Sequence, residues 1–161
     1  MIKNFDHYQH KKEVLKKIVL KLWARLLKEF KIDNTIDLFF NFTINHDFLT
    51  SYFQTNYNFI DNTIQHQEVV INLASVLFLL KEGYNNSYYN GRKDRLSFLK
   101  NNFKLTLLFC ILHELRHIIQ ARELKTFKNF NLYKKNYITE IEADNFALNY
   151  LKRKNYLKKD D

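Results

Sequence analysis

Residues 105–117 have the sequence LTLLFCILHELRH, in which an apolar run leads directly into two histidines and a glutamate. The apolar side chains recur every three or four residues, which is the spacing of one face of an α-helix. These positions are Leu105, Leu108, Phe109, Leu112, Leu115 and Ile119. The pattern predicts a helix from about Leu99 to Glu123 whose first half is buried in a hydrophobic core.

The end of this run, His113-Glu114-Leu115-Arg116-His117, has the spacing of a metal site. Residues four apart lie on one helix face, so His113 and His117 can each direct an imidazole nitrogen at one metal ion roughly 2.0–2.1 Å away. Glu114 can accept a proton from a water at that ion and return it to a leaving group. Chance alone places such a motif in on the order of one in a hundred chains of this composition, so it needs support from elsewhere in the sequence.

That support comes from residues 139–144, with the sequence TEIEAD. A two-histidine zinc site needs a third protein ligand and leaves the fourth position to water, and Glu140 fits the third place. Asp144 follows one helical turn later, where it can accept the second ring N–H of a ligating histidine. Glu142 projects about 200° around the helix from Glu140 and is the weaker candidate for a ligand.

The alternative is an acidic helix start that stabilises the helix dipole and pairs with Arg116, Arg122 or Lys134. Arg116 is expected to face away from the two histidines and to pair with a carboxylate. The helix is expected to begin near Ile138 or Thr139 and to end in a solvated, frayed tail over Lys152 to Asp161.

The histidine motif followed by residues 140–147, EIEADNFA, resembles the gluzincin group of HExxH zinc metallopeptidases. The likeness is greatest to small intracellular forms, the minigluzincins and the ImmA/IrrE-like proteins, and it covers about Phe98 to Leu151. It implies a zincin-like fold with Glu140 as the third zinc ligand. It also implies a protein or peptide substrate that adds as a strand along a sheet edge, here Glu68 to Asn72.

The rest of the chain predicts a helix followed by strands. The expected segments are a basic amphipathic helix at Lys11–Lys31, a strand at Ile36–Thr43, a hairpin over Tyr57–Leu73 that turns at Asp61-Asn62, a helix or strand at Ala74–Leu80, a loop at Gly83–Gly91 and a connection at Lys125–Asn136. We therefore expect a single α+β domain over residues 1–161, with an N-terminal helix within 1–31, a small, mostly antiparallel sheet, and metal-binding helices within 99–151.

Composition limits the classes of protein to consider. The chain of 161 residues is 46% hydrophobic, which excludes a disordered chain. Its single cysteine, Cys110, excludes an internal disulfide, and neither a secretory signal nor a membrane span is apparent, so we expect a cytoplasmic protein without a membrane partner. A net charge of +9 permits an anionic partner, but no nucleic-acid-binding motif accompanies it. The sequence indicates no oligomeric state.

The leading prediction is a peptidase with about one Zn²⁺ per chain and Glu114 as general base. The alternatives are a non-proteolytic metal-binding regulatory or interaction protein and, less favoured, a basic nucleic-acid-binding protein. Tyr137, Tyr133 and His66 are candidates for the group that stabilises the oxyanion. Cys110, three residues before His113, is expected to be a small core residue rather than a ligand.

Overall fold

The computed structural model describes residues 2–32, 36–41, 51–58, 63–72, 102–123 and 137–157. Its elements are α1 (Ile2–Glu29), β1 (Asp37–Asn41), β2 (Ser51–Asn58), β3 (Thr63–Asn72), α3 (Phe103–Glu123) and α5 (Tyr137–Arg153). The predicted α+β class is confirmed. The expectations for Ala74–Leu80, Gly83–Gly91 and 125–136 fall outside the described residues.

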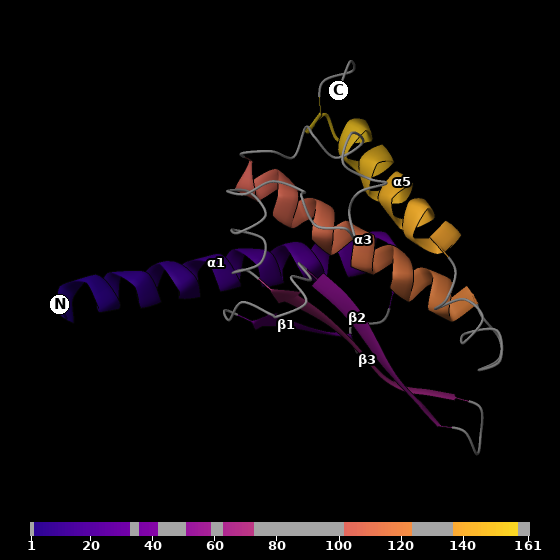
Figure 1. Ribbon diagram of the computed structural model, residues 1–161, viewed down its shortest axis with the longest axis horizontal. Helices are drawn as coiled ribbons and strands as arrows, with labels where there is room; N and C mark the ends of the chain where they lie inside the picture. The colour runs from indigo at the N-terminus through magenta and orange to yellow at the C-terminus, as the bar shows by residue number, and fades with distance from the viewer. Residues whose placement is uncertain are drawn as a thin grey trace.

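The helices lie over a small sheet and share one core with it (Figure 1). α3 contacts α5 on one side and β2 and β3 on the other, and α1 contacts β1. Every one of these helices contributes buried apolar side chains, among them Trp23 and Leu26 from α1, Leu112 and Leu115 from α3, and Leu151 from α5. Among the described helices, none combines the length and the apolar character that crossing a membrane requires.

The N-terminal helix is held against the start of the sheet by a polar contact as well as by its apolar stripe. The Trp23 indole Nε1–H donates a hydrogen bond of 3.1 Å to the carbonyl oxygen of Ile36, next to β1. An indole N–H that is buried needs such a partner, so this contact fixes how the helix meets the strand. The exposed face of α1 carries lysines and arginines, as the amphipathic pattern predicted, but it also exposes the apolar side chains of Val14, Ile18 and Leu20.

The predicted hairpin is confirmed, and its first strand starts earlier than expected. β2 and β3 pair antiparallel from Ser51 opposite Ile71 to Asn58 opposite Thr63. Residues 51–56 show only a weak alternation of aromatic and polar residues, so the sequence alone does not predict a strand there. Pairing with β3 supplies the hydrogen bonds that make this segment a strand, because β-structure depends more on neighbours than on intrinsic preference.

Two expectations about the sheet are wrong. The sheet is mixed rather than mostly antiparallel, because β1 pairs parallel to β3 from Asp37 opposite Glu68 to Asn41 opposite Asn72. The strand order is β1-β3-β2, so Glu68–Asn72 belongs to the central strand and is not an edge. The physical reason is that periodicity reports which face of a strand is buried, and this is the same for parallel and antiparallel neighbours.

The expected frayed tail is also corrected in part. Asn155 takes a positive φ of 58° just after α5, and the backbone N–H of Tyr156 donates to the carbonyl of Leu151 at 2.9 Å. This is the left-handed helix end that satisfies late carbonyl groups. It turns the chain so that Leu157 is buried against the core. The tail is therefore anchored as far as this residue.

The ends of α1 and α5 are tied together around Glu29. Its carboxylate accepts a hydrogen bond of 2.9 Å from the Tyr150 hydroxyl and pairs with Lys154 at 3.0 Å. Burial, followed by this contact with Glu29, raises the pKa of Tyr150 to about 12. The neutral hydroxyl is therefore the form that stabilises the fold.

Replacing Tyr150 with phenylalanine should lower the free energy of unfolding by about 1 kcal/mol, because one hydrogen bond to a charged group is lost while the ring remains. Denaturant unfolding measures this change. Tyr156→Phe is the matched control, since Tyr156 is an exposed residue, and it should leave stability unchanged. An equal loss in both variants would show that the Glu29 contact contributes nothing.

Candidate metal centre

The helix that carries the two histidines is fixed at its start and buried along its length. The Asn102 side-chain oxygen accepts a hydrogen bond of 3.1 Å from the backbone N–H of Leu105, which caps α3. Residues 105–115 are all buried. Because the core holds this helix on several sides, its last turns present His113 and His117 toward α5 in a fixed orientation.

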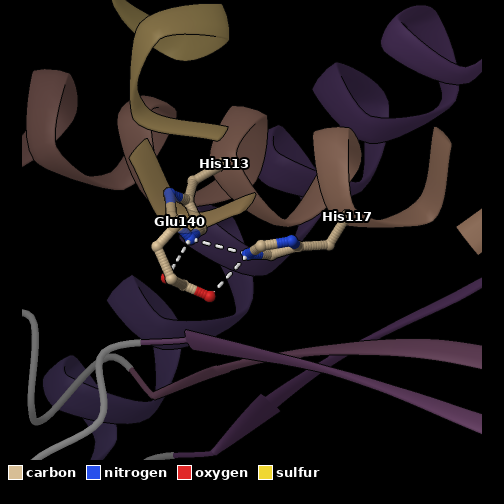
Figure 2. A group of neighbouring side chains, drawn as sticks. All are labelled: His113, His117 and Glu140. Atoms are coloured by element: carbon tan, nitrogen blue, oxygen red, sulfur yellow. Dashed lines mark hydrogen bonds and ion pairs between the residues drawn. The ribbon is translucent and has the colours of Figure 1, made fainter. Parts of the chain in front are cut away.

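His113, His117 and Glu140 bring their ligand atoms together (Figure 2). The Nε2 atoms of the two histidines are 2.9 Å apart, and each lies 3.3 Å from an oxygen of the Glu140 carboxylate. The imidazoles are buried, whereas the Glu140 side chain is 29% exposed. The centre is thus enclosed on the α3 side and reaches solvent beside the carboxylate.

Asp144 contacts the first histidine on its other ring nitrogen. Its carboxylate oxygen lies 2.9 Å from His113 Nδ1, and its side chain is completely buried. This is the contact that the one-turn spacing from Glu140 predicted. A carboxylate only accepts, so Nδ1 carries the hydrogen, and Nε2 is the nitrogen that faces the centre and can ligate a metal once it has lost its own proton.

The second histidine has a partner that the sequence analysis missed. His117 Nδ1 lies 3.0 Å from the Gln120 side-chain oxygen, and Gln120 Nε2 donates a hydrogen bond of 2.8 Å to Glu142. Arg116 in turn pairs with Glu142, as expected of an arginine that faces away from the histidines. A glutamine three residues after His117 lies on the same helix face, and this was the available signal.

The ionisable side chains of the centre shift one another's pKa values. Burial lowers the pKa of His113, but its contacts with Asp144 and Glu140 and the nearby charge of Glu114 outweigh burial and raise the pKa to about 9. Burial raises the pKa of Glu140, yet the contacts with His113 and His117 outweigh it and lower the pKa well below its ordinary value. The carboxylates around the two imidazoles therefore favour a positive charge at this point, either on the rings themselves or as a bound cation.

The donor set and its spacing suit a divalent metal ion. Two imidazole nitrogens and a carboxylate are ligands that zinc takes, and ligand atoms of a tetrahedral zinc site are roughly 3.3 Å apart. The observed separations of 2.9 and 3.3 Å fit this arrangement. Among the described residues, no other group of three histidine, cysteine or acidic side chains converges in this way.

Neighbouring residues that the sequence singled out take different places. Cys110 is buried in the apolar core and is not one of the converging ligands, as expected. Glu114 is buried beside His113 and is also not one of the three. His66 lies in β3 and Tyr137 is the first residue of α5, and the structure describes only the backbone at these two positions. Tyr133 lies outside the described residues. The oxyanion role of these three stays a prediction.

The chain matches no protein-family model, no curated protein and no solved structure.

Proposed function

We propose that the protein is a zinc-dependent metallopeptidase of the gluzincin type with a zincin-like fold. The observation that carries this proposal is the convergence of His113, His117 and Glu140 within 4.8 Å of one another from two separate helices. Glu114 directly follows the first of these residues. A purely structural metal site has no need of a glutamate at this position, whereas hydrolysis needs a general base there.

Zinc is the metal that the surroundings of the ligands favour. The contacts on the Nδ1 atoms leave both Nε2 atoms able to ligate, and such outer contacts are typical of metal-bound histidines. Three protein ligands leave one coordination position open, which is the arrangement of catalytic rather than structural zinc. Bound zinc would supply Lewis acidity for polarising a carbonyl group.

The protein's own residues supply proton transfer and substrate placement. Glu114 accepts the proton of the attacking water and gives it to the leaving amine, so that one carboxylate acts as base and then as acid. Its burial limits exchange of that proton with bulk water. The centre is reached beside Glu140, where the side chain is partly exposed.

An extended peptide would add to β2 rather than to β3. β3 is flanked on both sides, whereas β2 is one of the two outer strands of the described sheet and contacts α3, the helix of the two histidines. Addition of a strand at such an edge uses main-chain hydrogen bonds and tolerates many side chains. The proposed substrate class is therefore an unfolded segment of protein or peptide.

Removal of the metal tests the proposal. A mixture of unstructured peptides, analysed by mass spectrometry, should be cleaved by the zinc-loaded protein, and cleavage should stop when a chelator is added. Re-addition of about one equivalent of zinc should restore it, because one three-ligand site is present. Cleavage that persists in chelator would contradict the proposal. Zinc binding without any cleavage would instead indicate a metal-binding regulatory or interaction protein.

A further inference from the structure

A chain of three polar side chains connects the second histidine of the centre to the protein surface. His117 Nδ1 meets the Gln120 oxygen at 3.0 Å, and the Gln120 amide nitrogen donates to Glu142 at 2.8 Å. Arg116 donates to Glu142 from its Nε at 3.1 Å. Gln120 is 3% exposed, while Glu142 and Arg116 lie nearer to solvent. We call Gln120, Glu142 and Arg116 the His117 relay.

The relay fixes which ring nitrogen of His117 carries the hydrogen. Glu142 is an acceptor only, and the Thr139 carbonyl, 3.5 Å from the Gln120 amide nitrogen, is another acceptor. Turning the Gln120 amide over would set its oxygen against both of them. Its oxygen is therefore held toward His117, where it accepts the Nδ1–H. The Nε2 lone pair of His117 is then left facing Glu140 and His113.

The two histidines are oriented by different means. His113 contacts a carboxylate directly, in Asp144, which is completely buried. His117 instead contacts a neutral amide whose direction depends on a carboxylate and a guanidinium farther out. Removing Asp144 would remove a charge from the centre. Altering the outer residues of the relay would change the orientation of one amide and leave the ligands in place.

We propose that Gln120, Glu142 and Arg116 are positioning residues that set the His117 tautomer and thereby the affinity of the centre for metal. This inference rests on the proposed metal centre, but it makes a separate statement about the metal-free protein. It also gives a role to Glu142, which the sequence analysis considered only as the weaker candidate for a ligand. Glu142 does point away from Glu140, and it acts on His117 through Gln120.

The same hydrogen bonds also connect α3 to α5, so the test needs a readout that a purely structural connection between the helices would not change. Gln120→Glu and Glu142→Gln provide it, because the double variant exchanges the two side chains and keeps a donor opposite an acceptor between His117 and residue 120, between residues 120 and 142, and between residue 142 and Arg116. In the double variant a carboxylate at 120 accepts from His117 Nδ1–H and from the new amide at 142. The oxygen of that amide accepts from Arg116. Glu142→Gln alone breaks this order at His117, whereas Gln120→Glu alone still accepts from His117 but sets two carboxylates against each other.

The first measurement is the ring tautomer of His117 in the full, metal-free chain, from ¹⁵N NMR at about pH 8, above the ordinary pKa of histidine. The wild-type ring and the double variant should carry the hydrogen on Nδ1. In Glu142→Gln the Gln120 amide can turn over, so a population with the hydrogen on Nε2 should appear. Glu123→Gln is the matched control, because Glu123 pairs with Arg116 at 3.3 Å, whereas the carboxylate that accepts from the Gln120 amide is that of Glu142.

The second measurement is zinc affinity by competition with a chelator. Glu142→Gln should lose roughly 10–100-fold, as changes to residues that orient metal ligands typically do, and the double variant should recover most of that loss. The control should bind zinc like the wild type. Wild-type His117 with its hydrogen on Nε2, or a double variant no better than Glu142→Gln, would overturn the relay. If the wild-type chain binds no zinc, the metal proposal fails and the tautomer measurement still decides the relay.

Discussion

Replacing Glu114 with glutamine should abolish peptide hydrolysis while leaving the zinc and the fold in place. Glutamine has nearly the same shape, so the buried site can accommodate it. Its amide cannot accept the proton of the attacking water. General acid–base groups contribute typically about 10²–10⁴-fold to a rate, and the loss of turnover should lie in this range. Peptide cleavage at saturating zinc measures it.

The control for this variant is Glu13→Gln, which makes the same chemical change at an exposed position of α1. It should leave turnover unaltered. Zinc content and thermal unfolding of Glu114→Gln should match the wild type, which separates a lost base from a lost site. Undiminished cleavage by Glu114→Gln would remove this residue from the mechanism.

Replacing Glu140 with alanine should have the largest effect on metal binding. The variant leaves two imidazoles without the third ligand and without the negative charge that the centre supplies to a cation. The affinity for zinc should fall by more than about 100-fold, which exceeds what changes outside the ligand set usually cause. Chelator competition on the purified full chain measures the change.

Glu13→Ala serves as the control for this second variant, and it should bind zinc like the wild type. Asp144→Ala provides a comparison of another kind, because it removes a partner of His113 rather than a ligand and should cost roughly 10–100-fold. If Glu140→Ala kept its zinc while Glu142→Ala lost it, the ligand would have been assigned to the wrong position of α5.

The geometry around α3 could be predicted because it depends on local periodicity. His113 and His117 are four residues apart on a strongly periodic helix, so their common direction follows from the helix alone. The separation of Glu140 from Asp144 is likewise one turn of α5, and it predicts that the two reach the centre together. The structure brings His113, His117 and Glu140 together, and their roles at a metal remain predictions.

The sheet could be predicted only in part because its pairing is not local. The β2–β3 hairpin has a turn signal between its strands, whereas β1 pairs with β3 from a distant part of the chain. No sequence pattern states that these two strands run parallel. The central place of β3 follows from that second pairing, and this is why Glu68–Asn72 is not an edge.

The His117 relay was missed for a different reason. Gln120 does not stand out in the sequence, because glutamine carries no charge and is common on helices. Its function depends on Glu142, which comes from another helix, so the contact exists only after α3 and α5 pack. Arg116 was expected to pair with a carboxylate, and the connection of that pair to a histidine was not expected.

The most direct test of the central claim is the metal content of the full wild-type chain, purified without chelator and then titrated with zinc and iron. We predict about one zinc per chain, bound in preference to iron, as expected of two imidazoles, one carboxylate and an open position. A chain that carries no metal after purification and takes up none on re-addition would contradict the account. So would a chain that selects iron, because the same three ligands would then serve a different chemistry.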